Sequence, residues 1–249
     1  MSLILFYHPL ASFCHKVLIA LYENGTAFEG EIIRPDIPQE RAALLEFWPV
    51  GKMPVLRDET RGALVPESTI IIEYLDTHYP GARRLIPEDA EAALQARLWD
   101  RFFDQYIHQP MQKHVIDRIR ADDALRDPHG VKEAAATIDT AYAMLERHLA
   151  GREWMLGTGF SIADCAAAPA LFYSGVVHPF PKDAVHVRAY FDRLMARPSI
   201  RRTYEEAVPY FSLFPYRNEM PEGWGFRPIS GDQAWGRSSQ GVGGRSLND

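Results

Sequence analysis

The sequence predicts two domains of different class, a small mixed α/β domain followed by an all-helical domain. Over residues 1–80, short apolar runs alternate with segments of helical spacing. Beyond the turn at Pro80-Gly81, apolar residues recur only at helical spacing. The chain has 249 residues, of which 47% are hydrophobic, so it can bury a core in each domain.

Turn and cap signals set the elements of the first domain. The apolar run 3–7 predicts a buried strand, and Ser12 is the expected N-cap of a helix that Asn24-Gly25 ends. Pro54 cannot donate to a ladder, so it marks the start of a strand or an edge. The expected elements are, in order, strand 3–7, helix 12–24, strand 28–33, helix 40–47, strand 53–57, strand 63–65 and helix 68–79.

The second domain shows only helical signals. Ser161 followed by Asp164 is close to a capping box, and we interpret this pair as structural. The expected helices are 88–120, 131–149, one that follows Ser161, 184–196 and 199–207. We therefore divide the chain into domain 1–80, linker 81–88, helical domain 89–210 and C-terminal tail 211–249.

The tail combines large aromatics with Pro and Gly, which argues against a regular helix. Burial of several aromatics would offset the entropy of ordering it, so we expect it to fold back over the helical domain. Two roles remain open, a cover over a pocket and a structural brace. The aromatics concerned are Phe211, Phe214, Tyr216, Trp224, Phe226 and Trp235.

Composition narrows the possible partners. A net charge of −6 with interspersed signs gives no support for nucleic acid or an anionic membrane as partner. No apolar stretch is long enough for a membrane span and the N-terminus lacks a signal pattern, so we expect a cytoplasmic protein. Cys14 and Cys165 are the two cysteines and are expected as free thiols. The histidines form no ligand spacing, and we expect no metal site.

The segments Gly51-Lys52-Met53-Pro54 and Pro66-Glu67-Ser68 point to a binding site for a small acidic peptide. If the Met53-Pro54 bond is cis, the backbone of Met53 faces outward and an extended peptide can pair with it. Ser68 begins a helix whose free N–H groups attract a carboxylate.

These segments, together with Phe6-Tyr7-His8-Pro9 and Ser12 to Val17, resemble the cytosolic glutathione transferases, of bacterial type. The resemblance covers about the first 80 residues strongly and continues to about residue 205. It implies a thioredoxin-like N-terminal domain, a C-terminal helical-bundle domain and glutathione as co-substrate, with no other cofactor.

The resemblance also implies roles for the site residues. Glu67 and Ser68 would hold the γ-glutamyl group, Lys52 the glycyl carboxylate, and Met53 beside Pro54 would pair through its backbone. The acceptor pocket would be lined by Trp99, Phe103 and Tyr106, although core packing explains these aromatics equally well.

Two residues are candidates for the catalytic group. Ser12 matches the activating hydroxyl of serine-type members, but aligning the motif on Cys14 places Ala11 at the usual serine position. Cys14, in the first turn of a helix, would have a lowered pKa and form a mixed disulfide as in cysteine-type members. A packed core thiol is the favoured alternative. Tyr7 is a third possibility, and a strand-end aromatic is its favoured interpretation.

The function that the resemblance implies is a homodimeric glutathione transferase that activates the glutathione thiol for attack on a small hydrophobic electrophile or a peroxide. Two alternatives remain. One is a thiol transferase acting through Cys14, and the other is a non-catalytic protein that binds glutathione or hydrophobic ligands.

Overall fold

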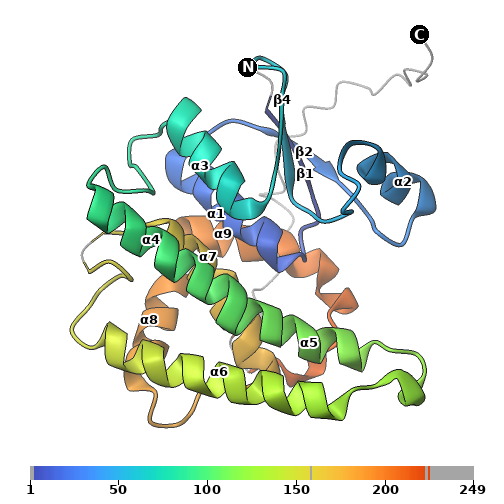
Figure 1. Ribbon diagram of the computed structural model, residues 1–249, viewed down its shortest axis with the longest axis vertical. Coiled ribbons are helices and arrows are strands. Elements are labelled where there is room, and N and C mark those ends of the chain that lie inside the picture. The colour runs from blue at the N-terminus through green and yellow to red at the C-terminus, as the bar shows by residue number, and fades with distance from the viewer. Residues whose placement is uncertain (1–2, 158, 222–223, 225–249) are drawn as a thin grey trace, which may run out of the picture.

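A computed structural model describes residues 3–157, 159–221 and 224 of the chain. Figure 1 shows a small sheet layer above a larger group of helices. Within the described ranges, no helix is long and apolar enough to cross a membrane.

The N-terminal part is a four-stranded mixed sheet of order β2-β1-β3-β4. The strands are β1 Leu3–Tyr7, β2 Glu29–Ile32, β3 Val55–Asp58 and β4 Ala63–Pro66. β1 pairs with β2 in parallel and with β3 antiparallel, and β3 and β4 form an antiparallel hairpin. The expected strands are confirmed to within about two residues at their ends.

Alternation along β1 divides the side chains between the two faces of the sheet. Leu3 and Leu5 belong to the main core with helices α1 Ser12–Asn24 and α3 Ser68–His78. Phe6 belongs to a smaller cluster with Leu44 of α2 Pro38–Phe47, so α2 covers the opposite face. In Figure 1, α2 accordingly lies apart from the other helices.

The predicted bounds of α1 are confirmed, but its N-cap differs from the prediction by one residue. Ala11, with extended backbone angles, occupies the N-cap position, and Ser12 is the first helical residue with no capping bond from its side chain. The chain turns earlier because the backbone N–H of Ala11 donates to the carbonyl of His8 at 3.0 Å. At the other end the prediction is confirmed, since Gly25 adopts the left-handed conformation at φ 62°.

The C-terminal part is helical. A long rod consists of α4 Ala90–Phe103, one π-helical turn Asp104–His108 and α5 Gln109–Arg118. The other α-helices are α6 Pro128–Leu149, α7 Ile162–Val177, α8 Val185–Met195 and α9 Pro198–Ala207, with a short 3₁₀ turn at Asp123–Leu125. In Figure 1, α6 runs back along the rod. The sequence predicted one helix over 88–120 and did not predict the π turn.

The capping box at α7 is confirmed. Ser161 is the N-cap, and Asp164 accepts from the Ser161 backbone at 2.8 Å. The same buried carboxylate accepts from the Met155 backbone at 3.0 Å and from the Tyr190 hydroxyl at 2.6 Å. Four hydrogen bonds, including one from the Ser161 hydroxyl, satisfy a charge that burial alone would make costly.

Helix α1 joins the two parts. Glu23 near its end receives two hydrogen bonds at 2.6 Å from Arg197, which precedes α9. Apolar side chains of α1, α3 and α7 belong to one continuous core. The sheet layer is thus fixed to the helices through α1.

The described part of the tail packs on the helical layer, as expected. It forms two short 3₁₀ turns, Val208–Leu213 and Arg217–Glu219. Phe214 lies edge-on to Tyr173 at 5.3 Å, and Trp224 lies 4.6 Å from Phe191 between ring centroids. The expectation for Phe226 and Trp235 concerns residues outside the described part.

Candidate functional site

A cleft of about 430 Å³ lies where the start of α1, the loop before β3, the start of α3 and the α4–α5 rod meet. The predicted glutathione-binding residues all line it. They are Lys52, Met53, Pro54, Glu67 and Ser68. Residues from two separate sequence motifs are therefore brought together on one surface.

The Met53-Pro54 peptide bond is cis, which meets the condition stated for this loop. Pro54 directly precedes β3, and Met53 lies beyond the paired part of the strand. The backbone N–H and C=O of Met53 form no hydrogen bond within the described part of the chain. They are free to pair with an extended peptide.

Glu67 is the only described non-glycine residue with a positive φ, at 69°. It connects β4 to α3, and its carbonyl accepts from the backbone of Ile71 at 2.8 Å. A left-handed backbone is unfavourable for a side chain such as glutamate, and residues of this kind cluster at ligand clamps. This conformation places an exposed carboxylate directly before Ser68 at the positive end of α3.

The cleft carries unpaired cations. Lys52 is exposed and, like Arg101 on α4, forms no ion pair with a described residue. Arg97 is different, because its guanidinium donates two hydrogen bonds to the Glu73 carboxylate in a bidentate ion pair, Nε to Oε1 at 2.8 Å and Nη2 to Oε2 at 3.0 Å. Lys52 and Arg101 are therefore available to an anionic ligand.

Ser12 lies at the first position of α1 and is not among the residues that line the cleft, although the next residue, Phe13, lines it. Its side chain is largely buried and forms no hydrogen bond with a described residue. The first N–H groups of a helix have no acceptor within it, so Ser12 combines a free hydroxyl with the positive end of α1.

Cys14 does not have the character of a reactive thiol, and the expectation of a lowered pKa is wrong. Its side chain is fully buried. Burial raises the pKa of Cys14 to about 12. A hydrogen bond with the backbone of His8 lowers this pKa, but by less than burial raises it. The favoured alternative of a packed core thiol fits these observations.

The native protein is therefore expected to react very slowly with a thiol reagent such as dithionitrobenzoate. Both of its cysteines are buried, and burial raises the pKa of each. Titration should count two thiols in urea and close to none under native conditions. Rapid native labelling of one thiol, located at Cys14 by peptide mapping, would contradict this description.

Tyr7 faces away from the cleft. Its ring lines a separate pocket, and its phenol has a pKa raised to about 12, mainly by burial and secondarily by the charge of Glu206. A hydroxyl that activates a thiol has to stabilise negative charge, which this environment opposes. Tyr7 is thus excluded as the activating group of this cleft.

The three aromatics expected to line an acceptor pocket are not among the residues of this cleft, and for Phe103 the expectation is wrong. Phe103 is fully buried in the core. The Trp99 ring packs on the ring of His148 of α6, with 4.0 Å between the ring centroids. Tyr106 is half exposed and its ring contacts that of Phe102. Core packing, the alternative stated for them, accounts for Phe103 and Trp99.

Another face of the same rod lines the cleft, and sequence reasoning missed it. This face is polar, and its spacing of four and three residues is the signal that identifies it. Its members are Arg97, Arg101, Gln105, Gln109 and Gln112, with Asp104 beside them.

A fully buried lysine links the elements that carry the cleft residues. The Lys16 ammonium on α1 contacts Asp100 at 2.7 Å and Asp104 at 2.9 Å, and it donates to the Thr69 hydroxyl at 2.8 Å. Thr69 in turn donates to Asp100 at 2.7 Å and directly follows Ser68. Burial raises the pKa of Asp104 although Lys16 opposes the shift. The network joins α1, α3 and the π turn around the binding residues.

A thioredoxin-like sheet with a cis-proline loop, joined to a helical domain, defines a class of glutathione-binding folds, and comparisons identify the family. Residues 5–83 match the glutathione S-transferase N-terminal domain, and residues 116–193 match its C-terminal domain. A glutathione S-transferase-like protein, LUC7 of Fusarium sp., is 30% identical over 159 residues, which cover 64% of this chain and 71% of the relative.

Solved structures of glutathione S-transferases have the same fold as this chain. A glutathione S-transferase from Methylobacterium radiotolerans, in complex with glutathione sulfonate, is 29% identical, with a TM-score of 0.70 and coverage of 82% of this chain and 94% of that one. A glutathione-bound transferase from Methylobacillus flagellatus has a TM-score of 0.74 at 22% identity, covering 81% and 98%. The chain belongs to the glutathione S-transferase family, and the predicted fold class and family are confirmed.

Proposed function

We propose that the cleft binds glutathione and lowers the pKa of its thiol for transfer to a small electrophile or for reduction of a peroxide. The observation that carries the proposal is the junction of Glu67 and Ser68, held in a left-handed turn beside the cis Met53-Pro54 bond. The relatives that are solved with glutathione or its sulfonate support the same ligand.

Each part of glutathione finds a complementary group. Ser68 and the N–H groups at the start of α3 bind the γ-glutamyl carboxylate, and Glu67 binds the amine. The free backbone groups of Met53 pair with the cysteinyl unit, as one strand pairs with another. Lys52 neutralises the glycyl carboxylate.

Ser12 is the proposed activating residue. Its hydroxyl, at the positive end of α1, donates to the sulfur and stabilises the thiolate more than the thiol. Cys14 takes no part, because its thiol is buried and protonated. The buried Cys14 favours thiol activation over disulfide exchange.

The homodimer is proposed from an exposed apolar face. Ile70 on α3 and Leu94 and Leu98 on α4 expose 51%, 58% and 56% of their surface, and they border the cleft residues of the same helices. Exposed apolar groups clustered on neighbouring helices indicate an association surface. The proposed setting is the cytoplasm and the proposed role is detoxification, with a small electrophile as acceptor.

Turnover of a generic aromatic electrophile with glutathione tests the activating residue. Ser12→Ala should lower kcat/KM about 10²- to 10³-fold, because it removes a hydrogen bond made to developing charge. Cys14→Ala, the matched control from the same turn, should keep its activity in whatever fraction folds. Loss confined to Cys14→Ala would favour thiol transfer, and no turnover in any form would favour a binding protein.

A further inference from the structure

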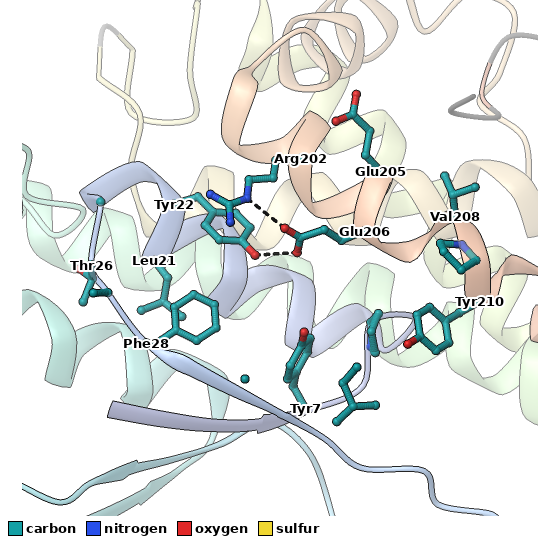
Figure 2. A pocket seen from close by; sticks show the side chains of 16 residues that line it. Tyr7, Leu21, Tyr22, Thr26, Phe28, Arg202, Glu205, Glu206, Val208 and Tyr210 are labelled. Carbon is teal, nitrogen blue, oxygen red and sulfur yellow. Dashed lines mark hydrogen bonds and ion pairs between the residues drawn. The ribbon is translucent and has the colours of Figure 1, made fainter. Parts of the chain in front are cut away.

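A second and larger pocket, of about 880 Å³, lies outside the glutathione cleft and shares no lining residue with it. One wall is formed by β1, β2 and the second half of α1, and the other by α9 and the 3₁₀ turn Val208–Leu213 (Figure 2). The pocket thus spans the junction of the sheet layer and the last helices. Its volume lies in the range of small-molecule sites.

Aromatic and aliphatic side chains form most of its surface. Tyr22, Phe28, Tyr7 and Tyr210 provide four rings from four different elements or loops (Figure 2). The remaining apolar lining is Pro9, Leu21, Ala27, Ile32, Val208 and Pro209. A surface of this kind favours a planar aromatic ligand, which can stack on rings.

Two charged groups at the upper edge of the pocket, Arg202 and Glu206, form an ion pair with each other. Glu206 accepts from the Tyr22 hydroxyl at 2.6 Å and from Arg202 at 2.9 Å, as the dashed lines of Figure 2 show. The Arg202 guanidinium also lies over the Tyr22 ring, 3.9 Å from its centroid. This cluster is a fixed part of the wall, and a ligand need not carry a charge to satisfy it.

The Tyr7 hydroxyl is one polar group of the pocket that remains available. It forms no hydrogen bond with a described residue, and in Figure 2 it points toward Glu206. Burial raises the Tyr7 pKa to about 12, so the phenol keeps its proton near neutral pH and acts as a donor. A Cβ atom at Gly30 would come within 2.9 Å of Cε1 of Tyr7, so the glycine in β2 leaves room for this ring.

We propose that this pocket is a binding site for a neutral planar aromatic compound that carries a carbonyl group. The rings enclose the aromatic part, and Tyr7 donates a hydrogen bond to the carbonyl oxygen. Glu205, Glu206 and a single arginine, Arg202, line the pocket from the same helix α9, so its charged lining is net negative, which disfavours an anion. Glutathione and its conjugates are anionic, so this site is distinct in chemistry from the proposed glutathione cleft.

The neutral naphthyl ketone Prodan is a suitable probe, because its emission reports both the polarity around it and hydrogen bonding to its carbonyl. The full chain should bind it saturably, with a blue-shifted emission. Saturating S-hexylglutathione, which fills a glutathione cleft and an acceptor site, should leave the probe bound. Since this readout does not depend on glutathione binding, failure of the proposed function and failure of this site are distinguishable.

Two variants locate the probe. Ala27→Trp, which adds a ring at an exposed lining position, should weaken Prodan binding at least about 10-fold by filling space. Tyr7→Phe keeps the ring but removes the donor, so it should weaken binding about 3- to 10-fold and shift the bound emission further to the blue. Tyr216→Phe, a tyrosine outside both sites, is the matched control and should bind as the wild type does.

An anionic probe tests whether the pocket disfavours negative charge. The anionic probe anilinonaphthalene sulfonate should not displace Prodan from the pocket. Displacement of Prodan by S-hexylglutathione, equal affinity in Ala27→Trp and wild type, or no saturable binding would each overturn the proposal. An unchanged affinity and emission in Tyr7→Phe would overturn the assigned hydrogen bond.

Discussion

Ser68→Ala is expected to weaken glutathione binding about 10- to 150-fold, since a hydrogen bond to a charged group contributes roughly 1.5–3 kcal/mol. Ser68 begins α3, is buried, and lines the cleft directly after the left-handed Glu67. Glu67→Ala, which removes the partner of the ligand's amine, should have an effect of similar size. Isothermal titration calorimetry measures both.

Ser212→Ala is the matched control, because Ser212 is an exposed serine in the 3₁₀ turn and lies outside the cleft. The melting temperatures of the three variants should stay close to that of the wild type. Unchanged affinity in both cleft variants would mean that Pro66-Glu67-Ser68 only starts a helix.

Lys16→Met is expected to lower the free energy of unfolding by about 3–5 kcal/mol, because removal of one partner leaves buried charges without compensation. The methionine fills a similar volume, but Asp100 and Asp104 lose their shared ammonium. Urea unfolding at a fixed protein concentration measures the loss. Lys132→Met, at an exposed lysine of α6, is the control and should change stability little.

The pH dependence of the Lys16→Met protein gives a second, independent readout. Burial already raises the pKa of Asp104, and removal of Lys16 removes an opposing effect. A carboxyl whose pKa is higher in the folded state binds more protons there, so stability falls as the pH rises through that pKa. Lys16→Met should thus be more stable at mildly acidic than at neutral pH, relative to Lys132→Met. A loss below about 1 kcal/mol with no such pH dependence would contradict a charged buried network.

The sequence predicted those parts of the site that lie in continuous motifs. Pro54 and the helix start at Ser68 act through local backbone rules, and local rules can be applied without the fold. The same holds for Gly25, where a left-handed residue ends α1. The N-cap of α1 was misplaced by one residue because the turn from His8 to Ala11 closes first.

The wall contributed by the rod is marked in the sequence by polar residues four and three apart, but that spacing does not tell which face of the helix meets the cleft. The resemblance led to Trp99, Phe103 and Tyr106 on the helix expected over 88–120. The π turn Asp104–His108 takes more residues per turn than an α-helix, so the faces before and after it do not follow one period. Packing of the rod against α6 and α7, a tertiary property, decides which face meets the cleft.

The contacts of Lys16 could not be predicted from the sequence either. They come from Thr69, Asp100 and Asp104, far along the chain, and no spacing rule links them to residue 16. Cys14 shows a related limit, since its place in the first helical turn suggested a low pKa. Burial of the side chain, which depends on the tertiary fold, raises the pKa of Cys14 instead.

The ionisation of bound glutathione tests the central claim most directly. The ultraviolet absorbance of the thiolate, followed against pH with the protein saturated by glutathione, gives the pKa of the bound thiol. An ordinary thiol has a pKa of about 8.5. For the wild-type protein we expect the bound thiol to ionise at least about one unit lower, and for Ser12→Ala we expect most of that shift to disappear while glutathione stays bound. A bound thiol that titrates like free glutathione in the wild type, or an equal shift in Ser12→Ala, would contradict activation by Ser12 in this cleft.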